Sequence, residues 1–215
     1  MLENITTAIK KRTPLFLFSA FLLTLFYAFS FVVKEDYLHG FDFDLTVKIQ
    51  NFIPVKFDPY FSILSLLGSF EVTLVILGVY AVMRRKVGGI IVLGLFCFMH
   101  VVEIIGKAYL DHPGTPFMFH RYAFDFVFPT GYVQPGGSYP SGHSMRTAFL
   151  AIILAQYYFK TKLNPHIKLF SYFAILAIYL LMIVSRVSLG EHWTTDVIGG
   201  SLLGAAFAIL SLVFI

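Results

Sequence analysis

The stretch YPSGHSMRTAFLAIILAQYYF, residues 139 to 159, places a polar turn directly in front of an apolar run. Pro140 and Gly142 favour a turn, so we expect a helix to begin near His143. Ionisable side chains close to a membrane span are costly, about 2.5 to 3.5 kcal/mol each at the bilayer centre, and such residues call for a functional cause. The stretch therefore predicts a membrane helix with chemistry at its polar end.

The composition of the whole chain supports a membrane protein. Of the 215 residues, 58% are hydrophobic and 13% are charged, whereas soluble domains are roughly half apolar and a quarter charged. A bilayer crossing needs about 20 helical residues, and six apolar runs reach this length once the polar start of the fourth is included. We predict an all-α, six-helix membrane bundle forming one domain, residues 1–215. The predicted spans are 15–33, 61–83, 87–106, 143–159, 169–185 and 196–215.

Three clusters of basic residues predict the orientation of the bundle, because Lys and Arg near span ends stay in the cytoplasm. The clusters are Lys10-Lys11-Arg12, Arg84-Arg85-Lys86, and Lys160 with Lys162 and Lys168. Successive clusters are separated by two spans, so all three fall on one side. We predict that both termini are cytoplasmic, in a plasma or inner membrane. The net charge of +4 is then a topology signal, and no nucleic-acid partner is expected.

The segments between the spans on the other side carry most of the carboxylates. In the first of them, Leu45, Ile49 and Phe52 follow a helical spacing, which predicts a helix lying flat on the outer membrane surface. The second is a long extracytoplasmic loop, residues 107–142, rich in aromatic residues. Two interpretations remain open for this loop: an aromatic belt at the headgroup level, or a lid that receives a lipid.

Several conspicuous residues have ordinary structural explanations. Cys97, the only cysteine, is expected to be a buried packing residue, and Trp193 an anchor at the membrane interface. His100, Glu103 and Lys107 share one helical face that leads to the outer end of the third span. We expect His100 to be packed in the bundle. A structural ion pair explains Glu103 and Lys107 as well as a site does.

Two further patterns favour a site. One is Pro140-Ser141-Gly142-His143, and the other is Ser185-Arg186-x5-His192-x3-Asp196. The predicted topology brings both patterns, together with Lys107, to the outer membrane face. A helix N-terminus offers unpaired N–H groups to an anion, Gly142 lets the backbone approach closely, and Ser141 adds a hydroxyl donor.

The charged residues of this set suit phosphate chemistry. Arg186 offers a planar fork that matches phosphate oxygens, and Lys107 supplies a point charge. His192 and Asp196 are one helical turn apart, so the carboxylate can accept a hydrogen bond from one ring nitrogen and leave the other basic. We predict that His192 is the nucleophile, that Asp196 orients it, and that His143 is the general acid.

These motifs resemble those of the type 2 phosphatidic acid phosphatase superfamily, whose signatures are Lys-x6-Arg-Pro, Pro-Ser-Gly-His and Ser-Arg-x5-His-x3-Asp. The second stands at 140–143 and the third at 185–196, and the resemblance covers the chain from about residue 60. It implies hydrolysis through a phosphohistidine on His192 without metal or cofactor, with His143 protonating the leaving group. The residues that it implies for phosphate binding are Lys107, Ser141, Gly142 and Arg186.

The first signature is incomplete. Where the family has Arg-Pro, seven residues after Lys107, this chain has Gly114-Thr115. An arginine that stabilises phosphoryl transfer can be worth about 10³ to 10⁵ in rate, so we expect a replacement. Arg146, one helical turn after His143, is the preferred candidate for this added phosphate contact. Arg121 and His112 are weaker ones.

The sequence therefore predicts an integral-membrane phosphatase that hydrolyses a lipid phosphate or diphosphate at the extracytoplasmic face. By analogy, its substrate is phosphatidic acid, phosphatidylglycerol phosphate, a polyprenyl diphosphate or a lipid A phosphate. One alternative is a transferase that passes the phosphorus-containing group to a lipid or sugar acceptor, an option that the altered first signature raises. The third possible function is a transporter or scaffold without catalysis. This possibility leaves the paired histidines unexplained.

Overall fold

The computed structural model describes residues 2–84, 87–121 and 137–215, and every regular element in these ranges is helical. The all-α prediction is confirmed for these residues. The helices are α1 (Leu2–Lys34), α2 (His39–Phe52), α3 (Asp58–Ser65), α4 (Phe70–Arg84), α5 (Val87–Tyr109), α6 (Gly142–Lys160), α7 (Pro165–Ser188) and α8 (Thr194–Leu212). Three short 3-10 turns, η1 (Val55–Phe57), η2 (Leu66–Gly68) and η3 (Phe117–Phe119), connect them.

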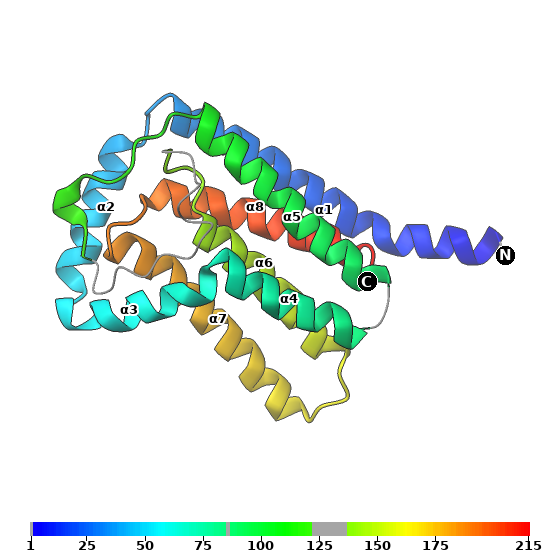
Figure 1. Ribbon diagram of the computed structural model, residues 1–215. Helices are drawn as coiled ribbons and strands as arrows, with labels where there is room; N and C mark the ends of the chain where they lie inside the picture. Colours follow the sequence, from blue (N-terminus) through cyan, green and yellow to red (C-terminus); the bar gives the residue numbers. More distant parts are fainter. Residues whose placement is uncertain (1, 85–86, 122–136) are drawn as a thin grey trace.

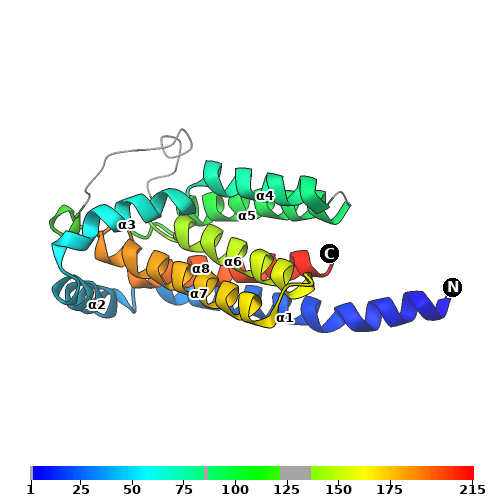
Figure 2. The same ribbon diagram turned by 90° about the horizontal axis from the view of Figure 1, so that it is seen from below.

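The long helices run side by side, with α8 in contact with α1, α5, α6 and α7 (Figures 1 and 2). Glycines on α8 allow the closest of these contacts, because a Cβ at Gly200 would overlap the Ser141 carbonyl and one at Gly204 the Met145 carbonyl. Both termini lie at one end of the bundle, and α2 and η3 lie at the opposite end. The end of α6 lies at the same end as the C-terminus, since Lys160 Nζ donates to the carbonyl of Ile215 over 2.9 Å.

Within residues 2–84, 87–121 and 137–215, four stretches are long and apolar enough to cross a membrane, and a fifth is added if one bent helix pair counts as a single span. The four are Arg12–Lys34, Val87–Tyr109, Pro165–Ser188 and Thr194–Leu212. The bent pair joins Val55–Gly68 to Phe70–Met83. Helix α6 has the length of a span but is not in this set, because its first two turns carry polar residues. The count of six spans remains a prediction.

The second predicted span, 61–83, is not one continuous helix. It breaks after Gly68 and bends by 50° between α3 with η2 and α4. Ser69 is extended, with ψ 155°, and its Oγ accepts a hydrogen bond from Val72 N at the start of α4. Small and hydroxyl residues tolerate such a break, whereas a run of apolar letters gives no sign of it. The break frees the Gly68 carbonyl for a side chain of the site.

Helix α2 forms where a surface helix was predicted. The face that packs against the bundle carries polar residues, and it is not the face that the apolar spacing marked. Phe52 is 87% exposed, whereas Asp42 and Thr46 are buried. Asp42 accepts hydrogen bonds from the backbone N and the Oγ1 of Thr195, at 2.9 and 2.6 Å. These bonds fix α2 to the first turn of α8. The position of α2 at a membrane surface stays a prediction.

Two structural expectations were wrong. Cys97 is exposed on the outside of α5, because the apolar residues of this helix that face inward are its neighbours Phe96 and Met99. Trp193 is only 3% exposed, and its Nε1 donates to the carbonyl of Pro113 over 3.0 Å. The indole therefore packs within the protein and does not act as an interfacial anchor. Most of the aromatic loop, residues 122–136, lies outside the described residues.

Candidate active site

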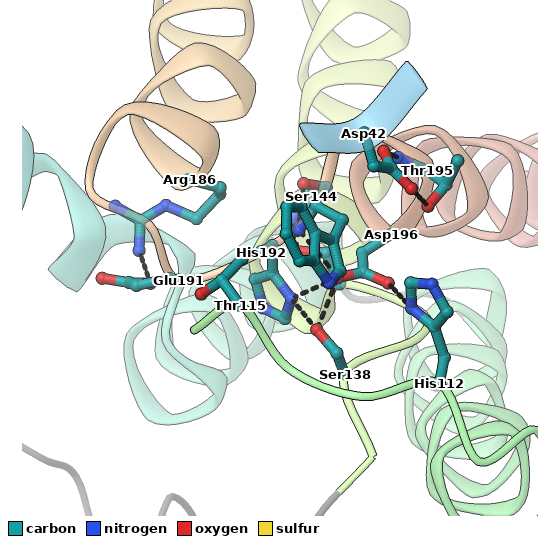
Figure 3. A network of polar contacts seen from close by, with 12 residues as sticks. Asp42, His112, Thr115, Ser138, Ser144, Arg186, Glu191, His192, Thr195 and Asp196 are labelled. Carbon is teal, nitrogen blue, oxygen red and sulfur yellow. Dashed lines mark hydrogen bonds and ion pairs between the residues drawn. The ribbon is translucent and has the colours of Figure 1, made fainter. Parts of the chain in front are cut away.

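A buried carboxylate, Asp196, organises one half of the site (Figure 3). It lies in the first turn of α8, where it accepts from the backbone N of Trp193 over 2.9 Å and caps the helix. Its Oδ2 also accepts from Ser138 Oγ and lies 3.3 Å from His192 Nδ1, while its Oδ1 lies 2.9 Å from His112 Nδ1. An ionised carboxylate only accepts, so Nδ1 of both histidines carries the proton. His192 then presents Nε2 as its basic nitrogen.

The second histidine on this carboxylate is strongly influenced by it. Burial lowers the pKa of His112, but the hydrogen bond to Asp196 and the charges of Asp196 and Asp42 outweigh burial and raise the pKa above its ordinary value. His112 thus keeps its positive charge to higher pH than a free histidine. When protonated, it adds a positive charge to the site from the loop that follows α5.

The first turn of α6 is held between α5 and α8. Ser141 is the N-cap, and its Oγ accepts from Ser144 N over 3.5 Å and from Ser144 Oγ over 3.2 Å. The backbone N of Ser141 donates to the Asp196 carbonyl over 3.0 Å. A Cβ at Gly142 would overlap Oε1 of Glu103. A larger residue at position 142 would therefore displace the Glu103 carboxylate from this helix N-terminus.

Arg186, near the end of α7, is fully buried, and its guanidinium is surrounded by acceptors. Nε and Nη2 donate to Ser185 Oγ over 3.2 and 3.0 Å, and Nη2 also donates to the Phe61 carbonyl over 3.5 Å. Nη1 donates to Ser65 Oγ over 2.7 Å and to Oε2 of Glu191. Figure 3 shows the Glu191 carboxylate facing the guanidinium from the loop between α7 and α8.

His143 lies near several groups that carry or can carry positive charge. Its Nε2 is 3.3 Å from Ser65 Oγ, the hydroxyl that also accepts from Arg186. Four groups are close enough to His143 to interact with it electrostatically, namely Arg186, Arg146, His192 and Lys107. The structure thus brings together residues from α5, α6, α7 and the α7–α8 loop.

Lys107 and Arg146 meet at a shared carboxylate. Glu103 lies 3.6 Å from Lys107 Nζ and 3.5 Å from Arg146 Nη1, and it also pairs with His100 Nδ1 at 2.8 Å. Nε of Arg146 donates over 2.6 Å to the Gly68 carbonyl, which the break between η2 and α4 leaves available. Arg146 is therefore fixed beside Lys107, and His100 is a packed residue as expected.

Of the two weaker candidates for replacing the first-motif arginine, Arg121 lies outside the site, whereas His112 lies within it. Arg121 binds Asp58 through Nε and Nη2, both at 3.0 Å, and stabilises the corner between α2 and α3. His112 binds Asp196. At the altered positions, Gly114 has open space around the direction of a Cβ, and Thr115 Oγ1 donates to the Gly190 carbonyl.

Three residues of the site were not predicted: Ser65, Ser138 and Glu191. Each is a single polar residue without a partner at a diagnostic spacing, so the sequence gives only weak signals for them. Ser138 directly precedes the Tyr139-Pro140 turn, Glu191 directly precedes His192, and Ser65 interrupts an apolar run. Their roles depend on segments that approach one another only in the folded chain.

Comparisons with known proteins show what the chain is similar to. A sequence model of the PAP2 superfamily matches residues 85–215. Phosphatidylglycerophosphatase B of Bacillus subtilis (strain 168) is 43% identical over 70 residues, which span 31% of this chain and about a third, 34%, of that protein.

Two crystal structures have a similar fold. The transmembrane PAP2-type phosphatidylglycerolphosphate phosphatase of Bacillus subtilis superimposes with a TM-score of 0.71 at 22% identity, covering 90% of this chain and 94% of that one. LpxE of Aquifex aeolicus gives 0.58 at 23% identity, covering 79% and 93%. At these identities the likeness concerns the fold alone.

Proposed function

The chain belongs to the PAP2 superfamily, and from this premise we propose that it is an integral-membrane phosphatase acting on a lipid phosphate or diphosphate monoester. One observation carries the proposal. His192 is held through Nδ1 by the buried Asp196, and it lies within electrostatic range of His143 together with Arg186, Arg146 and Lys107. A basic imidazole, a second imidazole and a group of cations are what phosphoryl transfer to a histidine requires.

In the first step, the substrate phosphate is bound by Arg186, Lys107, Arg146 and the N–H groups at the start of α6, including those of Gly142 and its neighbours. Nε2 of His192 attacks phosphorus and forms the P–N bond. The bond between phosphorus and the lipid oxygen breaks, and His143 donates a proton to that oxygen. Asp196 stabilises the imidazole ring as it gains positive charge.

In the second step, water attacks the phosphohistidine. His143, now without its proton, accepts one from the water, the P–N bond breaks, and inorganic phosphate leaves. His192 returns to its neutral form with the proton on Nδ1. Side chains and backbone N–H groups stabilise the negative charge of the phosphate, so the proposed reaction uses no metal ion or cofactor.

We place the site on the extracytoplasmic side. Two features support this orientation: the termini and Lys160 lie together at one end of the bundle, and the α7–α8 loop with His192 lies at the other. Positively charged ends stay in the cytoplasm, which leaves His192 on the opposite face. In this orientation the six predicted helices, α6 included, cross the bilayer, and the lipid headgroup reaches the site from the outer leaflet.

The first substrate to test is phosphatidylglycerol phosphate, because the names of two relatives specify it and its terminal phosphate is a monoester. Purified protein in detergent should release inorganic phosphate from this lipid or from another of a panel of lipid phosphates and diphosphates. His192→Ala should abolish release, and His166→Ala, which changes an exposed histidine outside the site, should not. Equal release by wild type and His192→Ala would refute the proposal, and a new lipid conjugate in place of free phosphate would indicate a transferase.

A further inference from the structure

The hydrogen bonds of Arg186 leave no donor free for a substrate. A guanidinium has five N–H groups, and the contacts of Arg186 use each of them. Ser185 Oγ accepts from Nε and from one N–H of Nη2, and the Phe61 carbonyl accepts the other. Ser65 Oγ and Glu191 accept the two N–H groups of Nη1. A phosphate can bind Arg186 only if one of these acceptors leaves.

The acceptors differ in how easily they can leave. Ser65 and the Phe61 carbonyl belong to α3, and Ser185 belongs to α7, where its own hydroxyl donates to the Met182 carbonyl over 2.7 Å. Glu191 lies on the loop between α7 and α8, and its side chain is 18% exposed, whereas that of Arg186 is 0% exposed. Glu191 is thus the acceptor that can rotate toward water without disturbing a helix.

The backbone of this loop does not need to move. The backbone N atoms of Glu191 and His192 donate to the Arg186 carbonyl over 3.0 and 3.3 Å, and Gly190 makes the turn with a φ of 70°. A carboxylate and a phosphate bind a guanidinium through the same kind of charge-assisted hydrogen bond. The Glu191 carboxylate therefore binds Arg186 through the same kind of contact that a phosphate oxygen would make.

We propose that Glu191 is an internal competitor of the substrate phosphate for Arg186. It is a positioning residue, which acts through Arg186 and leaves that side chain when phosphate binds. In the empty site it neutralises a buried guanidinium, whose charge is costly without a partner. After the reaction it returns and helps to expel inorganic phosphate. This inference rests on the proposed function, since it takes Arg186 as a phosphate ligand.

Removal of the carboxylate should therefore strengthen phosphate binding. Glu191→Gln leaves Nη1 with a neutral acceptor, which phosphate displaces more easily. We expect the Kd of inorganic phosphate and of orthovanadate to fall about 10-fold, the scale of one charge-assisted hydrogen bond. The KM for the lipid substrate should fall as well. The kcat should not rise, because product phosphate leaves more slowly.

The experiment is a titration of full-length protein in detergent with inorganic phosphate and with orthovanadate by isothermal titration calorimetry. Fluorescence of Trp193, the only tryptophan and the neighbour of His192, gives a second readout. Glu35→Gln is the matched control, because it removes the same charge from an exposed carboxylate just beyond α1, and we expect an unchanged Kd. Glu191→Asp keeps the charge and should bind phosphate more like the wild type than Glu191→Gln does.

Thermal unfolding of each variant establishes that it is folded, and Glu191→Ala carries the same expectation if Glu191→Gln does not fold. An unchanged or weaker phosphate affinity in folded Glu191→Gln, or in folded Glu191→Ala where it takes the place of Glu191→Gln, overturns the inference. That result differs from a failure of the proposed function, in which the wild type releases no more phosphate from lipid phosphates than His192→Ala. Tighter phosphate binding by Glu191→Gln and not by Glu35→Gln supports the inference.

Discussion

His112 donates to Oδ1 of Asp196 over 2.9 Å, on the carboxylate oxygen opposite the one that faces His192. The carboxylate that orients the proposed nucleophile is therefore shared with a second imidazole. The Asp196 carboxylate stabilises the protonated form of His112, and the pKa of His112 is therefore raised above its ordinary value of 6.5. Protonation of His112 therefore contributes to the stability of the folded state.

The first prediction concerns the pH dependence of stability. A group whose folded pKa is raised stabilises the fold fully below its unfolded pKa, and this contribution is lost as the pH rises through the raised value. His112→Asn keeps a neutral donor and removes the charge. It should lower the free energy of unfolding by about 1 to 2 kcal/mol near pH 6 and by less near pH 9. Thermal unfolding across this range is the measurement, with His166→Asn as control, and an equal loss at both pH values would contradict it.

The general-acid role of His143 can be tested with leaving groups of different basicity. His143→Ala should reduce phosphate release from a lipid phosphate, whose alkoxide needs a proton, by about 10² to 10⁴. Transfer from p-nitrophenyl phosphate to His192 should be reduced much less, because its leaving group departs without protonation. Rapid-mixing measurement of p-nitrophenol release in the first turnover separates the two cases. Equal losses for both substrates would exclude this role.

Arg146 is proposed to replace the arginine missing at position 114. Arg146→Ala should reduce kcat/KM on the scale of Arg186→Ala, about 10³-fold, whereas Arg121→Ala, which breaks the pair with Asp58, should affect stability more than turnover. A Cβ at Gly114 meets nothing within 4 Å, so a side chain can begin there without a clash. Adding Gly114→Arg to Arg146→Ala should restore part of the activity. Near wild-type turnover in Arg146→Ala would refute the proposal that Arg146 replaces the missing arginine.

Gly68 is predicted to be a packing requirement of the site. A Cβ at this position would lie 2.9 Å from Cδ2 of His143, so Gly68→Ala should displace the imidazole and lower kcat by about 10-fold or more. Gly78→Ala is the matched control, since nothing lies within 4 Å of a Cβ there and alanine favours the helix by about 1 kcal/mol. Kinetics and thermal unfolding of the two variants give the comparison. A similar kcat in both would show that His143 tolerates the shift.

Activity should not depend on a divalent metal, because Lys107, Arg146 and Arg186 supply the positive charge near His143. Phosphate release by purified protein should therefore persist after dialysis against EDTA. Orthovanadate, which adopts the five-coordinate geometry of the transition state, should inhibit it. Loss of activity in EDTA with recovery on adding Mg²⁺ would contradict the proposed mechanism.

The helical composition of the bundle was predictable because long apolar runs leave few alternatives to a membrane helix. The break after Gly68 was not, since a single glycine and serine barely change the hydropathy of the run. The side of α2 that packs inward was also missed. Its buried contact is the polar pair of Asp42 with Thr195, whereas apolar periodicity reports only the contacts of hydrophobic residues.

The candidate site was predictable where its residues occur at fixed spacings, as with His192 and Asp196 one turn apart. Glu191, Ser65 and Ser138 escaped because their partners are fixed only by tertiary contacts. Ser65 is 78 residues from His143 and 121 from Arg186, and it contacts both. Distances of this kind along the chain leave no local pattern.

The bond between Arg146 and the Gly68 carbonyl makes two distant positions depend on each other during evolution. In a lipid surrounding, a main-chain oxygen that has lost its helical partner is costly unless another donor replaces it. The discontinuity in one helix is therefore tolerable only while the guanidinium from α6 is present. A homologue that lost this guanidinium would be expected either to regain an unbroken second helix or to provide a different donor at the same place.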